Sequence, residues 1–126
     1  MNLEMKRIIE YASTLGIVEV SSPSFSIIGD GTYYGLPELV DTAWIIRVHN
    51  KGKELDIVKG AYITSEGIVM TTQAVNYTTL NWKYHLKSLV GKIRKLELVA
   101  KEQKENERIA KMEKDFNDQK RIFRHL

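Results

Sequence analysis

The 126-residue chain contains no cysteine and only two prolines. Without cysteine it cannot form a disulfide, a thiolate nucleophile or a zinc site with sulfur ligands. No run of apolar residues approaches the roughly 18 that a membrane-spanning helix needs, and no apolar signal region follows Met1. These absences predict a soluble, cytoplasmic protein with no membrane partner.

The residues that are present indicate an ordered globular chain. Apolar residues make up 43% of the sequence and charged residues 28%, and no stretch combines low hydrophobicity with charge of one sign. We expect a single domain over residues 1–126, with a helix and a sheet in residues 1–78 and one long basic helix in residues 79–126.

Positive charge is concentrated in the second of these regions. Residues 1–82 hold 6 basic and 9 acidic residues, a net charge of −3, whereas residues 83–126 hold 13 and 7, a net charge of +6. The basic character of the chain therefore belongs to its C-terminal segment.

Residues 3–15 have the apolar spacing of an amphipathic helix, with Met5, Ile8 and Ala12 on one face and Gly16 as its natural end. From Ile17 to Thr72 short β-rich runs alternate with turn residues, which predicts an antiparallel sheet of about four to six strands. The clearest hairpin joins 42–49 to 54–58 across Asn50–Lys53. The other expected strands are Ile17–Val20, Ser24–Ile28 and Thr32–Tyr34, the last two as a possible hairpin across Gly29–Gly31. A further hairpin is expected to join Ala61–Thr64 to Ile68–Thr71.

Helical spacing begins after Tyr77–Thr79, where a threonine can serve as N-cap. Apolar residues then step by four, three, four and three at Trp82, Leu86, Leu89, Ile93 and Leu96. The rhythm pauses over residues 101–108 and resumes about one position out of phase at Ile109, Met112, Phe116 and Phe123. We predict one amphipathic helix; a helical hairpin turning near Asn106 is the alternative. The predicted fold class is α+β.

A continuous helix of about 45 residues would reach roughly 65 Å, longer than a small sheet can cover. Its far end needs a partner, and another copy of the chain is the simplest one. We therefore expect a homo-oligomer that assembles through the C-terminal helix.

Five basic residues and no acidic one lie between residues 83 and 95 of this helix: Lys83, Lys87, Lys92, Arg94 and Lys95. Lys87, Arg94, Lys101 and Arg108 recur every seven residues and form a stripe along one side. Such a stripe attracts phosphate groups of a nucleotide or a nucleic acid. The alternative is that these residues are the solvated flanks of an oligomeric seam.

Aromatic, amide and cationic side chains gather at Asn81-Trp82-Lys83-Tyr84-His85, where the sheet gives way to the helix. Aromatic rings beside basic residues can stack on nucleotide bases, so this segment is the preferred ligand-pocket candidate. The alternative is that Trp82, like Trp44, is an aromatic residue of the core.

Evidence for catalysis is thin. Asp41, Glu54, Asp56 and Lys59 loosely resemble a metal-dependent nuclease site, but two residues rather than one separate Asp56 from Lys59, which puts them on opposite strand faces. Charges of a surface hairpin are the preferred interpretation. The three histidines, at 49, 85 and 125, have no ligand spacing. We predict no catalytic residue, no metal and no cofactor.

This layout of a short helix, a small antiparallel sheet and a long basic helix resembles small phage-encoded anti-defence proteins, above all nucleotide-sequestering sponge families such as the first Thoeris anti-defence family. The resemblance implies binding of a cyclic nucleotide signal without cleavage, by a homo-oligomer, in the cytoplasm of a bacterial host. It also implies roles for six residues. Trp82 and Tyr84 would stack, Asn81 would read a base edge, and Arg47, Arg94 and Arg108 would hold phosphates.

Three functional hypotheses follow. The first is a non-enzymatic protein that sequesters an anionic small molecule, a nucleotide by preference. The second is a protein-interaction inhibitor or adaptor, comparable to anti-CRISPR proteins of this size, and the third is a nucleic-acid-binding accessory protein.

Overall fold

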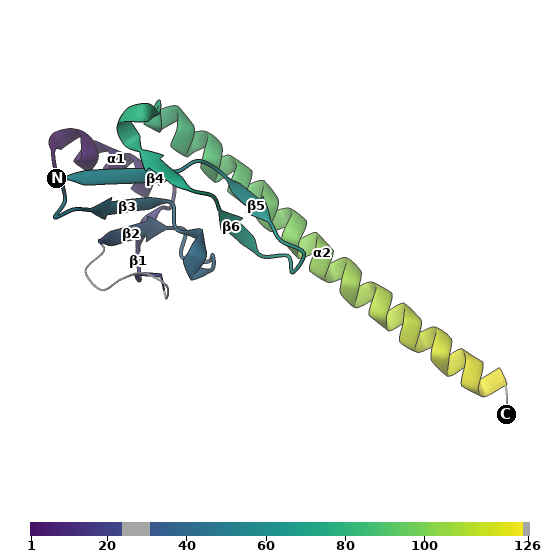
Figure 1. Cartoon of the computed structure of the whole chain (residues 1–126). Coiled ribbons are helices and arrows are strands. Elements are labelled where there is room, and N and C mark those ends of the chain that lie inside the picture. Colours follow the sequence, from purple (N-terminus) through teal and green to yellow (C-terminus); the bar gives the residue numbers. More distant parts are fainter. Residues whose placement is uncertain (24–30, 125–126) are drawn as a thin grey trace.

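The computed structural model describes residues 1–23 and 31–124, with side chains for 1–23 and 31–118. A short helix, α1 (Leu3–Thr14), comes first, short strands follow, and a long helix, α2 (Trp82–Arg124), ends the described chain (Figure 1). The predicted α+β class is therefore confirmed. The expected strand Ser24–Ile28 and the side chain of Phe123 lie outside the described residues.

Helix α1 begins and ends where the sequence indicates. The Asn2 side chain caps it by accepting a hydrogen bond of 2.8 Å from the Met5 N–H. Gly16 follows with φ of +88°, a left-handed conformation that glycine adopts without steric cost. Met5, Ile8 and Ala12 are buried, which confirms the predicted apolar face.

Five antiparallel strands form the main sheet, in the order β1-β2-β3-β4-β7. The predicted hairpin is β3 (Ile46–His49) with β4 (Glu54–Val58), paired so that Ile46 faces Ile57 and His49 faces Glu54. Its tight turn has positive φ at Asn50, Lys51 and Gly52. The remaining strands of this sheet are β1 (Val18–Val20), β2 (Thr32–Gly35) and β7 (Ala74–Asn76).

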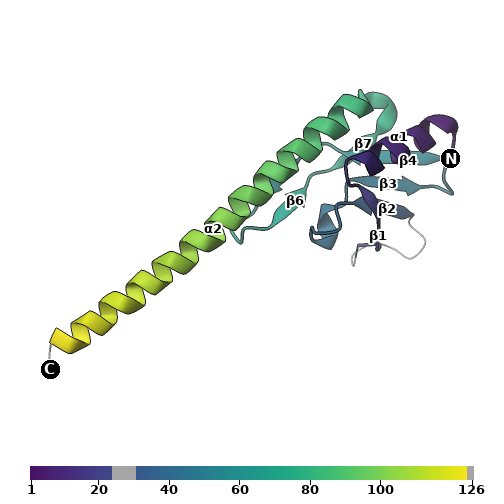
Figure 2. The same cartoon turned by 180° about the vertical axis from the view of Figure 1, so that it is seen from behind.

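The second predicted hairpin, β5 (Ala61–Ile63) with β6 (Val69–Thr71), forms a separate two-stranded sheet. It lies along α2, as both views of the chain show (Figures 1 and 2). The Thr71 hydroxyl ties it to the main body by donating to the carbonyl oxygens of Thr42 and Trp44, at 3.1 and 3.2 Å.

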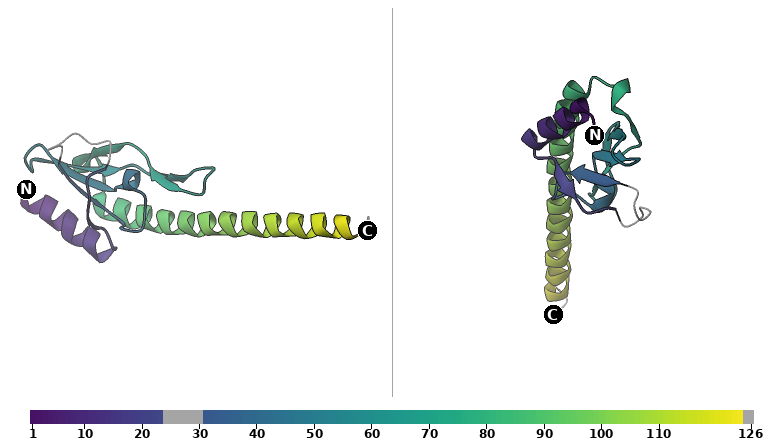
Figure 3. Two further views of the ribbon diagram at one scale, coloured as in Figure 1. Left: turned by 90° about the horizontal axis from the view of Figure 1, so that it is seen from below. Right: turned by 90° about the vertical axis from the view of Figure 1, so that its left-hand side faces the viewer.

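The two faces of the main sheet differ. Both helices lie on one face (Figure 3), where Ile46, Val48, Leu55 and Ile57 are buried against them. Intervening residues of the same strands point to the opposite face and are polar: Arg47, His49, Glu54 and Asp56. Side chains of residues 46–49 therefore alternate between the buried face and the polar face, as in an ordinary half-buried strand.

Helix α2 is continuous, so the helical-hairpin alternative is wrong. Its predicted apolar residues face the body, and Ala100 extends them by one step. We call this set the inner seam: Trp82, Leu86, Leu89, Ile93, Leu96 and Ala100. Every residue from 101 to 118 is exposed, and α2 runs on past the β5–β6 hairpin away from the body (Figure 1).

Three local predictions are corrected. Residues Asp41–Ala43 form a 3-10 turn rather than the start of strand β3, closed by the Ala43 N–H on the Val40 carbonyl. Tyr77–Thr79 is also a 3-10 turn, capped by Asn76, and α2 begins only at Trp82, so the predicted threonine does not stand directly before the helix. Strand β7 was not predicted.

Candidate functional site

The structure divides the predicted ligand-binding residues among separate places. Arg47 lies on the open face of the main sheet, away from α2. Asn81 and Trp82 lie at the start of α2, and Tyr84 and Lys87 follow on its exposed side. Arg108 lies on the exposed distal part of the helix. These residues do not converge on one pocket.

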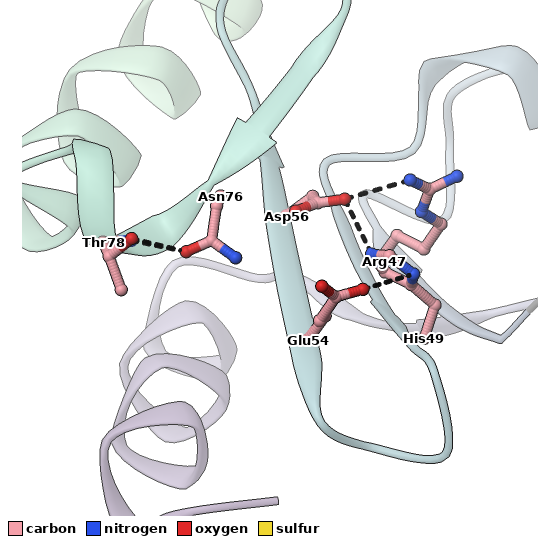
Figure 4. A network of polar contacts seen from close by, with 6 residues as sticks. All are labelled: Arg47, His49, Glu54, Asp56, Asn76 and Thr78. Atoms are coloured by element: carbon pink, nitrogen blue, oxygen red, sulfur yellow. Dashed lines mark hydrogen bonds and ion pairs between the residues drawn. The ribbon is translucent and has the colours of Figure 1, made fainter.

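Arg47 belongs to a polar network on the open face (Figure 4). Its Nη2 donates to Asp56 Oδ2 at 3.0 Å, and the same oxygen lies 2.8 Å from His49 Nε2. His49 Nδ1 lies 3.4 Å from Glu54 Oε2, and the Arg47 guanidinium stacks 5.7 Å from the centre of the Trp44 ring. Glu54 and Asp56, two of the three acids in the nuclease-like set, thus lie against basic neighbours.

Trp82 joins the two helices. Its ring meets that of Tyr11 edge to face, with centroids 5.9 Å apart, and its Nε1–H donates to Glu4 Oε1 at 3.3 Å. The Lys83 ammonium lies 5.4 Å from the centre of the Tyr11 ring. Half-buried in this contact, Trp82 has the packing role that was the alternative to ligand stacking.

Both predicted phosphate-binding arginines of α2 make ion pairs. Arg94 bonds to Glu38, a neighbour from the loop after β2, and also to Glu97 at 3.4 Å. A bond from its own backbone N–H, together with Arg94, lowers the pKa of Glu38 below its ordinary value, and Glu38 raises the pKa of Arg94. Arg108 pairs with Glu105 one turn away, at 3.1 Å.

Lysines of the proximal part of α2 are different, because Lys87, Lys92 and Lys95 make no ion pair with any residue the structure describes. They surround a shallow hollow of about 490 Å³ on the side of α2 that faces away from the body. The floor is low because Gly91 has no side chain and the space above it is open. The lining residues are Tyr84, Lys87, Ser88, Gly91, Lys92 and Lys95.

This hollow is part of a longer exposed strip on α2. Two residues along a helix turn the side chain by about 200°, so the residue two positions after each inner-seam residue points away from the body. The first five exposed positions so defined are the proximal strip: Tyr84, Ser88, Gly91, Lys95 and Leu98.

The same four-three spacing continues beyond the body as the distal strip: Glu102, Glu105, Ile109, Met112 and Phe116. Ile109, Met112 and Phe116 are 45%, 63% and 58% exposed. The sequence placed these apolar residues on the helix but did not show that they share a line with the proximal hollow. The sequence does contain the pattern that would have shown it: a second series of positions with four-three spacing, each two residues after an inner-seam residue.

No protein-family model, curated protein or solved structure matches this chain. None of the described helices combines the length and the apolar character that crossing a membrane requires. In the described part of the chain, no group of three or more histidine, aspartate or glutamate side chains is placed to hold a metal ion. The exposed side of α2, with the proximal hollow and the distal strip, is the candidate functional surface.

Proposed function

We propose that this chain is a non-enzymatic, self-associating binding protein, with α2 as its assembly element. The observation that carries the proposal is the distal strip, which exposes Ile109, Met112 and Phe116 on one line of a helix standing clear of the body. Exposed residues of this kind on one helical line are typical of a helix that packs against another helix.

The physical argument concerns the helix beyond Lys104. Isolated helices of this length are marginal in water, and most helical stability in proteins comes from packing an apolar face. Each buried side chain of the size of Met or Ile contributes about 1.5–3 kcal/mol. A second copy of the chain offers an identical surface, and a two-fold pair closes without leaving either strip open.

Light scattering of the purified chain over a range of concentrations tests the proposal. We expect a mass of two chains for the wild type and a shift towards one chain for Met112→Lys. The lysine ammonium would be buried between the two helices without an opposite charge beside it, which is unfavourable.

Ala110→Lys is the matched control, since it adds the same charge to the same turn of α2 away from the strip. It should leave the mass unchanged. A wild type that stays monomeric throughout, or equal effects of the two variants, would contradict self-association through this strip.

A second candidate function is the binding of an anionic ligand, with a nucleotide as the preferred class. It is favoured by Lys87, Lys92 and Lys95 around the proximal hollow, where Tyr84 is 71% exposed and free to stack on a base. A nucleotide is also the class of ligand that the resemblance in chain layout to nucleotide-sequestering anti-defence proteins would imply. Among the predicted site residues, Tyr84 and Lys87 fit this role, whereas Arg94 is already held by carboxylates.

A further inference from the structure

Charge divides α2 into two unequal parts. Residues 83–95 contain five basic residues and no acidic one, whereas residues 97–118 contain seven acidic residues and five basic ones. The proximal strip carries Lys95, and the distal strip carries Glu102 and Glu105. A helix with one basic and one less basic part is complementary to itself only when a second copy runs in the opposite direction.

Resting on the proposed self-association, we infer that two α2 helices pair antiparallel, so that the distal strip of each copy covers the proximal strip of the other. The two-fold axis crosses the pair at the level of Ala100, on the side of α2 that faces away from the body. Each contact then joins two residues whose numbers add up to 200: Tyr84 with Phe116, Ser88 with Met112, Gly91 with Ile109, Lys95 with Glu105, and Leu98 with Glu102.

Side-chain size supports this register. The hollow over Gly91 receives Ile109 of the partner copy, and the small Ser88 faces the partner's Met112. Helix pairs pack in this way, with the large side chains of one helix filling the spaces beside small side chains of the other. At the outer layer the exposed ring of Tyr84 meets that of the partner's Phe116, an aromatic contact.

Charge separates this register from the others. A parallel pair would place Lys95 against Lys95 and Glu105 against Glu105, which is unfavourable at positions between helices. Sliding the antiparallel pair by one heptad would put Lys95 opposite Leu98 or Met112 instead of a carboxylate. Only the register centred on Ala100 places Lys95 opposite Glu105, and it also brings Lys87 beside the partner's Asp115.

Engineered cysteines test the register, because the wild-type chain has none. A chain carrying both Gly91→Cys and Ile109→Cys should form a covalent dimer under mild oxidation, since these positions face each other across the pair. Within one chain the two positions are about 27 Å apart along the helix, so no intrachain disulfide can form. Ile109→Cys alone should stay uncrosslinked.

The outcomes separate the two proposals. If Ile109→Cys alone crosslinks efficiently, the pair is parallel and the antiparallel register is wrong, while self-association stands. If light scattering shows only monomer and no cysteine variant crosslinks, self-association itself fails and the register with it.

Charge reversal gives an independent test without disulfides. Lys95→Glu should weaken the dimer by about tenfold or more, because it faces Glu105 with a like charge. Adding Glu105→Lys to the same chain should restore much of the lost affinity, although it also removes the Glu105–Arg108 ion pair within each helix. Both side chains are exposed in the single chain, so the fold should be unaffected. A double variant as weak as Lys95→Glu alone would overturn the pairing of these two positions.

Discussion

Asp56 is the residue on which the polar face of the main sheet depends. One of its oxygens accepts from Arg47 and lies beside His49, and its side chain is only 15% exposed. A carboxylate this enclosed needs the polar contacts of its neighbours, and Arg47 in turn needs the carboxylate. The arrangement is structural as it stands, because both acids of the hairpin are occupied by side chains from the neighbouring strand.

We expect Asp56→Asn to lower the free energy of unfolding by about 1.5–3 kcal/mol, the range for hydrogen bonds to charged groups. Urea denaturation followed by circular dichroism measures the change. Asp115→Asn, which removes a carboxylate from the exposed part of α2, should cost much less under conditions where the protein is monomeric. If the two variants lost equal stability, the network would not have the structural weight assigned to it.

At this scale the sequence revealed residue types but not their partners. Arg94 and Trp82 were correctly placed on the long helix, yet the groups that hold them, Glu38 and Glu4, lie 56 and 78 positions away along the chain. When the neighbours of a cationic or aromatic side chain in the fold are unknown, the sequence alone suggests that the side chain can bind a ligand. The assignment of Arg47 had the same limit, because Asp56 is its neighbour only through the β3–β4 register.

Among the elements, those with a local signature were predicted best. Helix α1, the β3–β4 hairpin and the inner seam of α2 each follow from a period or a turn contained in the element itself. Strand β7 has three residues, too few to show a period, and exists because it pairs with β4 at the sheet edge. Residues 42–45 were predicted as the start of the strand, but Asp41–Ala43 form a 3-10 turn with Trp44 directly after it. So short a stretch has no local pattern that distinguishes a turn from the end of a strand.

Helix α2 contains two stretches with different sources of stability. Up to Ala100 the inner seam is buried against the body, whereas from residue 101 to 118 every residue is exposed within a single chain. In the proposed pair, the partner helix that covers the distal strip is the main source of stability for the second stretch.

Hydrogen exchange should separate the two stretches. In Met112→Lys, we expect amide protection to fall at residues 105–118 as the pair dissociates, and to remain near the wild-type level at residues 84–98, which the body holds. In Ala110→Lys both stretches should keep their protection. Unchanged protection of residues 105–118 in dissociated Met112→Lys would show that the distal helix is stable by itself.

For the whole molecule, the proposed antiparallel pair would put the two bodies on opposite sides of the joined helices, since the inner seam faces away from the proximal and distal strips. The open polar faces of both main sheets then remain at the surface. The basic hollow does not, because the partner's distal strip covers it. Self-association and binding of an anionic ligand thus draw on the same lysines, and each would oppose the other.

We therefore expect a nucleotide with several phosphates to shift the dimer towards monomer more than sodium chloride of equal ionic strength does. Plain salt weakens the Lys95–Glu105 contact by screening, whereas a bound ligand also occupies Lys92, Lys95 and the ring of Tyr84. Light scattering at matched ionic strength measures the difference, and Lys92→Gln should reduce it while Lys114→Gln, on another side of the helix, should not. Identical curves with nucleotide and with salt would remove anionic-ligand binding from the hollow and leave the lysines to the partner helix alone.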